Sequence, residues 1–94
     1  MIPVRDVAPR AVLELLRGQP LTPAKVRFAW RASVGPAMAR ATSVELAGDG
    51  TLHVSAAGEH WRAETARSMA VIRPRVCELL GRGAVKRIAV KGRG

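Results

Sequence analysis

The chain is short of the residues on which disulfides, metal centres and membrane spans depend. It has one cysteine, two histidines, no tyrosine and one phenylalanine among 94 residues. A single cysteine, Cys77, can form neither an internal disulfide nor a cysteine-based zinc site. No segment approaches the roughly 20 consecutive apolar residues of a transmembrane helix, and no secretory signal is recognisable at the N-terminus. These absences predict a single-domain cytoplasmic protein without membrane contact.

Groups for catalysis are also scarce. The chain has seven carboxylates, and it shows neither a phosphate-binding glycine loop nor a dinucleotide-binding fingerprint. His53 and His60 have no cysteine or acid at metal-ligand spacing. Ser55 and His60 lack the nucleophile elbow and the orienting acid of a catalytic triad. The sequence therefore predicts a protein that is not an enzyme and that uses no metal, cofactor or small-molecule substrate.

What the chain has in excess is positive charge. It carries 16 Lys and Arg residues against 7 acids, a net charge of +9, and 13 of the cations are Arg. Arg makes planar, bidentate contacts with phosphate, which favours an anionic polymer as the partner. The last quarter of the chain, from Arg73 onward, holds seven cations and one acid. We expect these cations to follow a nucleic-acid backbone, although a solvated surface or docking on an acidic protein would also account for them. They are Arg73, Arg75, Arg82, Lys86, Arg87, Lys91 and Arg93.

The aromatic residues argue against sequence-specific recognition. A base-stacking surface needs exposed aromatic side chains on strands, whereas all three aromatics here fall at helical positions. Trp30 and Trp61 are expected in the core. Phe28 lies off the apolar stripe, where it would form a protein interface with Arg27 and Arg31 or pack beneath the first helix.

Hydrophobic periodicity and turn residues predict the elements of the first half. A flexible lead over residues 1–8 precedes a helix that begins at Pro9 and ends at Gly18. Thr22 and the following proline start a second helix. Its predicted buried stripe is Val26, Trp30 and Val34, with Lys25, Arg27 and Arg31 off it. Gly35 and Pro36 interrupt this helix, and a short further turn continues to Ala41.

The second half begins with a predicted hairpin and ends with a strand. Residues 42–47 and 51–56 alternate in polarity around a Gly-Asp-Gly turn. A helical pattern follows over residues 59–80, and Pro74 is expected to kink it or to begin a second helix. The last strand is predicted from Val85 to Lys91. Its cations Arg87 and Lys91 are expected on the open face of the sheet near His53, and a flexible basic tail over residues 92–94 should follow.

These elements predict an α+β fold in the order α-α-β-β-α(α)-β. The economical packing is a small α+β sandwich over residues 9–91, with a three-stranded sheet and helices on one face. The last strand follows a long helical crossover, which permits parallel pairing with an earlier strand.

An ordered series of residues resembles the DciA family over about residues 10–91. The series is Trp30-x-x-x-Val34-Gly35, Ala39, Thr42, Leu46, Leu52-x-Val54, Trp61-x-x-Glu64 and Leu80-Gly81-x-x-x-Val85-x-x-Ile88. The resemblance implies a KH-like domain and a non-catalytic adaptor that binds the DnaB-type replicative helicase and single-stranded DNA during helicase loading. Within it Trp30, Val34, Gly35 and Trp61 are motif positions with a structural role. Thr65 departs from the family, which often has an aliphatic residue there.

Two other functions fit the same composition. A KH-like RNA-binding or ribosome-associated protein would also be basic and non-catalytic. Neither Gly81-Arg82-Gly83 nor Gly92-Arg93-Gly94 has the Gly-x-x-Gly spacing of the KH backbone clamp, however. The second alternative is a protein-interaction domain whose charge only keeps it in solution.

Overall fold

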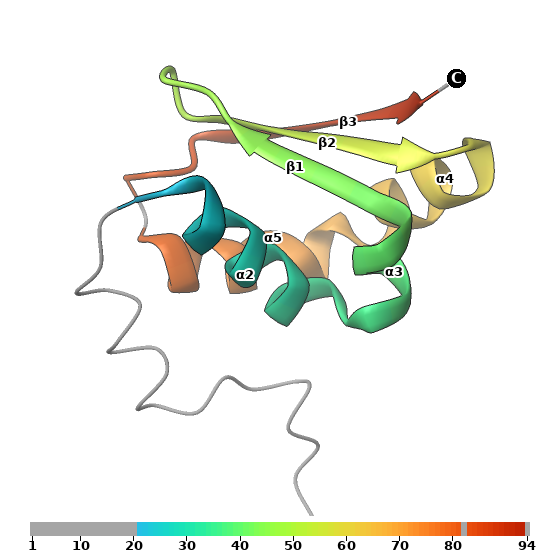
Figure 1. Cartoon of the computed structure of the whole chain (residues 1–94), viewed down its shortest axis with the longest axis horizontal. Helices are drawn as coiled ribbons and strands as arrows, with labels where there is room; N and C mark the ends of the chain where they lie inside the picture. Colours follow the sequence, from blue (N-terminus) through green and yellow to red (C-terminus); the bar gives the residue numbers. More distant parts are fainter. Residues whose placement is uncertain (1–20, 82, 94) are drawn as a thin grey trace, which may run out of the picture.

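The computed structural model describes residues 21–81 and 83–93, which form two layers, a β-sheet and the helices packed on it (Figure 1). The predicted lead, the helix from Pro9 and Arg82 lie outside the described residues. In chain order the elements are α2 (Pro23–Val34), α3 (Pro36–Ala41), β1 (Thr42–Leu46), β2 (Thr51–Ala57), α4 (Glu59–Arg67), α5 (Met69–Leu80) and β3 (Arg87–Arg93).

The three strands form one mixed sheet in the order β1-β2-β3. Strands β1 and β2 are antiparallel, with Val44 opposite Val54, and β2 and β3 are parallel, with Leu52 opposite Ile88. Figure 1 shows the helices on one side of this sheet, while no described element covers the other side. The predicted fold class, the hairpin and the parallel pairing of the last strand are confirmed.

The sequence around α2 and α3 fixes where these helices begin and end. Thr22 has extended backbone and its Oγ1 accepts the Lys25 N–H at 3.1 Å, while Pro23 occupies the first helical turn. This is the N-cap arrangement that the two residues predict. Gly35 ends α2 with φ +87° and ψ 168°, a conformation that is open almost only to glycine. Gly35 therefore acts at the turn from α2 into α3.

The buried face of α2 is broader than the predicted stripe. Val26 and Trp30 are buried as expected, and Val34 is half-buried. The neighbouring row, Lys25, Ala29 and Ser33, is buried as well. The prediction that Lys25 lies off the buried face was therefore wrong. Residues four apart share one side of a helix, so Lys25 follows the fully buried Ala29 toward the interior.

The core lies between the sheet and the α2–α5 pair. Leu52 and Val54 of β2 are fully buried, and the apolar side of α5 packs beneath them. That side consists of Ile72, Val76, Leu79 and Leu80. Trp30 is buried within this cluster, whereas Trp61 is only half-buried and packs against it from α4. The expectation of a core position is confirmed in full for Trp30 and in part for Trp61.

The helical pattern over residues 59–80 breaks at Ser68 rather than at Pro74. Ser68 ends α4 with φ −89° and ψ 1°, and Pro74 lies inside α5. The break changes the direction of the chain, because α4 contacts β2 and β3 whereas α5 contacts α2. The carbonyl that Pro74 leaves without an N–H partner belongs to Ala70, an exposed residue, so water can bind it.

The last strand is shifted by two residues from its predicted position. It begins at Arg87 rather than Val85, whose side chain is buried in the preceding turn. It continues through Gly92 and Arg93, which pair with Ala56 and Ala57. These two residues therefore belong to the sheet instead of a basic tail. The parallel register with β2 sets these limits, and the sequence of the strand alone does not contain that information.

Candidate nucleic-acid interface

Strand β3 forms one edge of the sheet and presents two cations on its open face. Along β3, Arg87, Ala89 and Lys91 are exposed, whereas Ile88 and Val90 are half-buried toward the helices. His53 of β2 lies opposite Ala89, between the two cations. The predicted placement of Arg87 and Lys91 beside His53 is thereby confirmed.

Three cations gather where the turn before β3 meets the hairpin, and we call Arg73, Lys86 and Arg87 the basic corner. The N–H groups of Lys86 and Arg87 donate to the Gly50 carbonyl at 2.7 and 3.3 Å. Arg73 of α5 donates from Nη2 to the Lys86 carbonyl at 3.3 Å. Residues from the hairpin, α5 and β3 are thus joined at one point of the surface.

Gly50 is required for this close approach. Its φ is +89°, and a Cβ built on it would lie 2.8 Å from Cγ of Lys86. A side chain at position 50 would therefore need a rare backbone conformation and would displace Lys86. The second glycine of the Gly-Asp-Gly turn consequently positions one of the cations.

Arg87 is held by neighbouring groups of the hairpin. Its Nη1 donates to Thr51 Oγ1 at 2.9 Å and lies 3.5 Å from Asp49 Oδ2. The Thr51 N–H donates to Asp49 Oδ1 at 3.0 Å. This backbone bond is the main reason that the pKa of Asp49 lies below its usual value; the Thr51 hydroxyl, Arg87 and His53 lower it further. Asp49 is thus ionised at neutral pH and fixes the direction of the Arg87 guanidinium.

The structure separates Arg75 from the other predicted contact residues. Arg75 is half-buried and its Nη1 donates to the Ser33 carbonyl of α2 at 3.3 Å. Residues two apart on a helix point about 200° apart, so Arg73 and Arg75 leave α5 on opposite sides. Arg87 and Lys91 therefore share the open face of the sheet, Arg73 reaches the basic corner from α5, and Arg75 faces α2.

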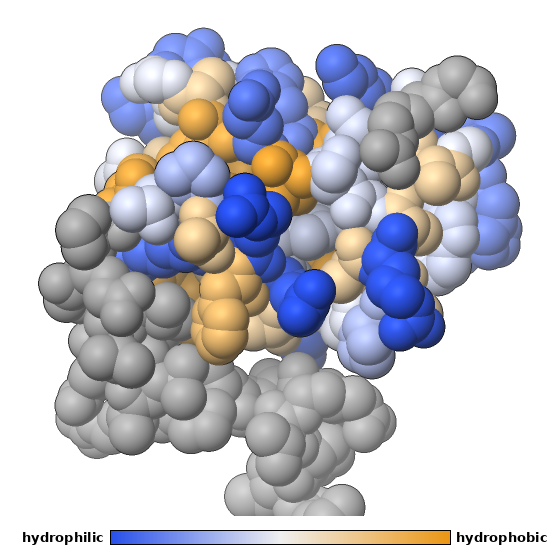
Figure 2. Space-filling view, in the orientation of Figure 1, coloured by the Kyte–Doolittle hydropathy of each residue, from blue (hydrophilic) through white to orange (hydrophobic). Residues whose placement is uncertain are grey.

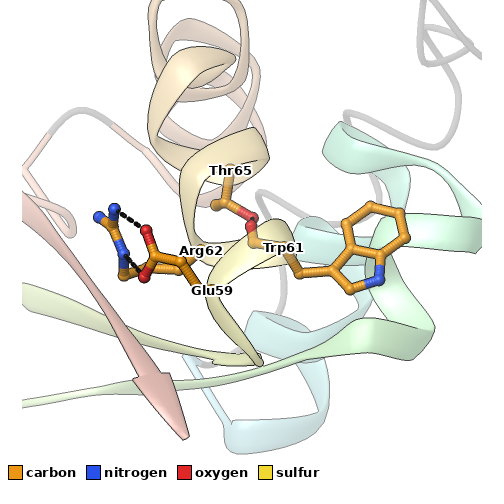
Figure 3. Close-up of polar contacts among 4 residues, drawn as sticks. All are labelled: Glu59, Trp61, Arg62 and Thr65. Carbon is orange, nitrogen blue, oxygen red and sulfur yellow. Dashed lines mark hydrogen bonds and ion pairs between the residues drawn. The ribbon is translucent and has the colours of Figure 1, made fainter.

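Helix α4 adds a cation that the sequence analysis missed. A Cβ on Gly92 would lie 3.8 Å from Cδ of Arg62, so the Arg62 side chain passes over β3. Arg62 also forms two bonds to Glu59, of 2.7 and 2.6 Å (Figure 3), and these lower the pKa of Glu59. The spacing Glu59-x-x-Arg62 could have suggested the ion pair, but only the packing of α4 on the sheet brings Arg62 to β3.

The residues of the resemblance motif have structural roles. Trp30 is 3% exposed, and its Nε1–H donates to Thr42 Oγ1 at 2.8 Å. The Thr42 hydroxyl in turn donates to the Met38 carbonyl at 2.7 Å. Trp61 leaves α4 on the side opposite Arg62, and Thr65 Oγ1 donates to its carbonyl at 2.7 Å (Figure 3). The two bonds of Thr42 tie α2, α3 and β1 together, and the side chain of Trp61 packs α4 against the core.

The predicted partner residues are exposed on α2. Arg27 and Arg31 are exposed and one helical turn apart, and Phe28 is 50% exposed beside them. Within residues 21–81 and 83–93, no group of His, Cys, Asp and Glu could hold a metal ion. No helix in that part of the chain is long and apolar enough to cross a membrane.

The comparison with protein families agrees with this geometry. A family model described as "Dna[CI] antecedent, DciA" matches residues 3–90. The chain belongs to the DciA family. The search of curated proteins found no match. Membership in DciA supports a non-catalytic role of the helicase-loader type in DNA replication, with the replicative helicase as the associated partner.

This DciA chain lacks the glycines of a KH clamp at the junction where its two later helices meet. KH domains hold a nucleic-acid backbone with a Gly-x-x-Gly loop. Here α4 and α5 meet at Ser68 in the sequence Ala66-Arg67-Ser68-Met69. Arg67 at that junction is paired with Glu64, whose pKa this pair lowers. In this DciA domain, four cations with described side chains lie on β3 or at the basic corner, and three further exposed cations, Arg27, Arg31 and Arg40, lie on α2 and α3.

Proposed function

We propose that this chain is a non-catalytic adaptor of DNA replication that binds the replicative helicase and single-stranded DNA and assists helicase loading. Family membership supports the helicase as partner. The observation that carries the DNA-binding part is the joining of Arg73, Lys86 and Arg87 at one corner, with Lys91 further along the same strand. Such a surface contacts the phosphates of the DNA rather than its bases. A helicase loader requires this kind of contact, because it must bind DNA of any sequence.

The open face of the sheet supports binding without base recognition. The Phe and Trp residues of the described chain all lie on helices, so the imidazole of His53 is the one ring on the described open face. The proposed mode of binding therefore rests on phosphate contacts rather than on an array of stacked bases. Backbone contacts alone predict a weak dependence on sequence and a strong dependence on salt.

The test is the salt dependence of binding to a fluorescent oligothymidine. Each neutralised phosphate of a single strand contributes about 0.7 to the slope of log K against log salt. Four cations would give a slope of at most about −2.8, and the double variant Arg87→Gln/Lys91→Gln should make it shallower by about 1.4. The matched control is Arg27→Gln/Arg31→Gln on α2, which removes the same charge and should leave the slope near the wild-type value.

Four outcomes would count against the proposal. A DNA affinity that does not change with salt would exclude phosphate contacts. If both double variants lost the same DNA affinity, the net charge of the protein would explain binding without a defined site. Failure of the wild-type chain to bind the purified replicative helicase, measured by calorimetry, would remove the loader role. A strong preference for an RNA oligonucleotide of the same length would favour the RNA-binding alternative, against which the absence of glycine at the α4–α5 junction argues.

A further inference from the structure

A groove runs between α2 and the outer edge of β1 and continues past the hairpin turn to Ala84 and Lys86, which precede β3. It consists of two adjoining hollows, of about 590 and 160 Å³, that share Arg27 and Val44. The larger hollow is lined by apolar groups of Val26, Val44, Leu46 and Ala84. Figure 2 views the molecule from the β1 side and shows apolar surface gathered around this strand, with hydrophilic side chains about it. We call this feature the α2–β1 groove.

The backbone of β1 has free bonding capacity toward the groove. The Ala47 N–H donates to the Thr51 carbonyl at 2.9 Å, and in an antiparallel pair such bonded positions alternate. Glu45 therefore bonds to β2 in the same way, whereas the N–H and C=O groups of Val44 and Leu46 point away from β2. No hydrogen bond joins these groups to another described residue. An edge of this kind accepts an additional strand.

The charge of the groove specifies the chemistry of its occupant. Arg27 and Arg31 line the smaller hollow, to which no acid contributes. Of the acids at the larger hollow, Glu45 lies in the exposed row of β1, and Asp49 is bonded to Thr51 and Arg87. A second copy of this chain would bring another net charge of +9 and a second Arg pair to the same place. A negatively charged segment is therefore favoured over self-association.

We propose that the α2–β1 groove binds an extended acidic segment of the replicative helicase, which adds a strand to β1. An apolar side chain of this segment occupies the larger hollow. An acidic side chain two or four residues along, on the same face of the added strand, lies beside Arg27 and Arg31. Because it names the helicase, the inference rests on the proposed function. It assigns the helicase to the β1 edge of the sheet and the DNA to the β3 edge, with Lys86 of the basic corner at the far end of the larger hollow.

The first experiment measures the affinity of the full chain for the purified helicase. Arg27→Glu/Arg31→Glu should weaken binding roughly tenfold or more, since it places like charge against the acidic segment. The matched reversal Arg73→Glu/Lys91→Glu changes the net charge equally on the β3 side and should leave helicase affinity within about twofold while it weakens DNA binding. If both variants lost the same helicase affinity, or if Arg27→Glu/Arg31→Glu lost none, the proposal that the groove binds the helicase would be wrong.

The second experiment tests strand addition at single amides. On binding of the helicase, hydrogen exchange should slow at the Val44 and Leu46 N–H groups, while Glu45, already bonded within the sheet, should change little. Unchanged exchange at Val44 and Leu46 would overturn strand addition. Slowing of these two amides with protein concentration alone would show a second copy in the groove and would overturn the acidic occupant. Failure of the wild-type chain to bind helicase overturns the proposed function as well, whereas unchanged affinity of the groove variant overturns only this inference.

Discussion

The hydroxyl of Thr42 links three elements, and its removal gives the sharpest test of how this small core is held. Thr42 is 9% exposed. Its Oγ1 accepts the Trp30 indole N–H at 2.8 Å and donates to the Met38 carbonyl at 2.7 Å. Among the described residues, no buried side-chain nitrogen or oxygen is without a partner. Thr42→Val keeps the shape of the side chain and leaves the indole N–H and the carbonyl unpartnered.

The size of the effect follows from those two groups. A buried polar group that loses its partner costs about 1–3 kcal/mol. Two such groups, offset by the easier burial of a methyl group, give an expected loss of about 2–4 kcal/mol. A domain of this length is stable by roughly 5–14 kcal/mol. The variant should therefore lose a substantial part of its stability, and its urea midpoint should fall by about 1–2 M at an ordinary m-value.

The assay is urea unfolding followed by far-ultraviolet circular dichroism, with Thr65→Val as the matched control. Thr65 is fully buried, and its hydroxyl donates to the Trp61 carbonyl four residues earlier at 2.7 Å. That carbonyl also belongs to the backbone ladder of α4, so the control should cost about 1 kcal/mol or less. A loss in Thr42→Val no greater than that in Thr65→Val would refute the reasoning. In a double-mutant cycle, Trp30→Phe and Thr42→Val should be non-additive, because both remove the same bond.

Two further predictions concern the hairpin turn. Gly50→Ala should cost about 1–3 kcal/mol in urea unfolding, because it places a side chain at φ +89° and 2.8 Å from Cγ of Lys86; a loss below about 0.5 kcal/mol would show that the turn relaxes without strain. Since the pKa of Asp49 is lowered in the folded chain, its stabilising contribution is fully present above the ordinary carboxyl pKa of about 3.9 and is lost as the pH falls through the folded value. The protection factor of the Thr51 amide, which compares its exchange rate with that of an unstructured amide at the same pH, should therefore fall on acidification. Asp49→Asn should remove that response; an unchanged response in the variant would exclude Asp49 as its origin.

Local signals in the sequence were sufficient for much of the fold. Thr22 and Pro23 define the start of α2 through a single capping bond, and the Gly48-Asp49-Gly50 turn with alternating strands defines the hairpin. Both features depend on residues within a few positions of one another. The cations on the open face of β3 follow from the two-residue period of a strand, so Arg87 and Lys91 were placed correctly.

Features that depend on packing between distant elements were not predictable in this way. The break at Ser68 arises because α4 and α5 pack against different partners, and Pro74, the stronger local signal, does not mark it. Counting charge along the chain places Arg73 and Arg75 in one predicted binding surface. In the structure, the helical geometry of α5 directs the Arg75 side chain toward α2 instead. The Arg62 side chain lies close to Gly92, a residue 30 positions further along the chain, and no periodicity within either element indicates this proximity.

The parallel pairing of β2 with β3 has a consequence for the order of folding. Leu52 and Ile88, which face each other in this pair, are 36 positions apart, whereas the β1–β2 hairpin closes over the four residues between Leu46 and Thr51. Pairing of β3 with β2 closes the longer loop, which has a high entropic cost until α4 and α5 have folded and shortened it. We therefore expect β3 to join the sheet late in folding. The cations of β3 reach their register with Thr51 and His53 at that stage. Affinity for phosphate at this edge is therefore coupled to completion of the domain, and partly folded chains present the same charges without their spacing.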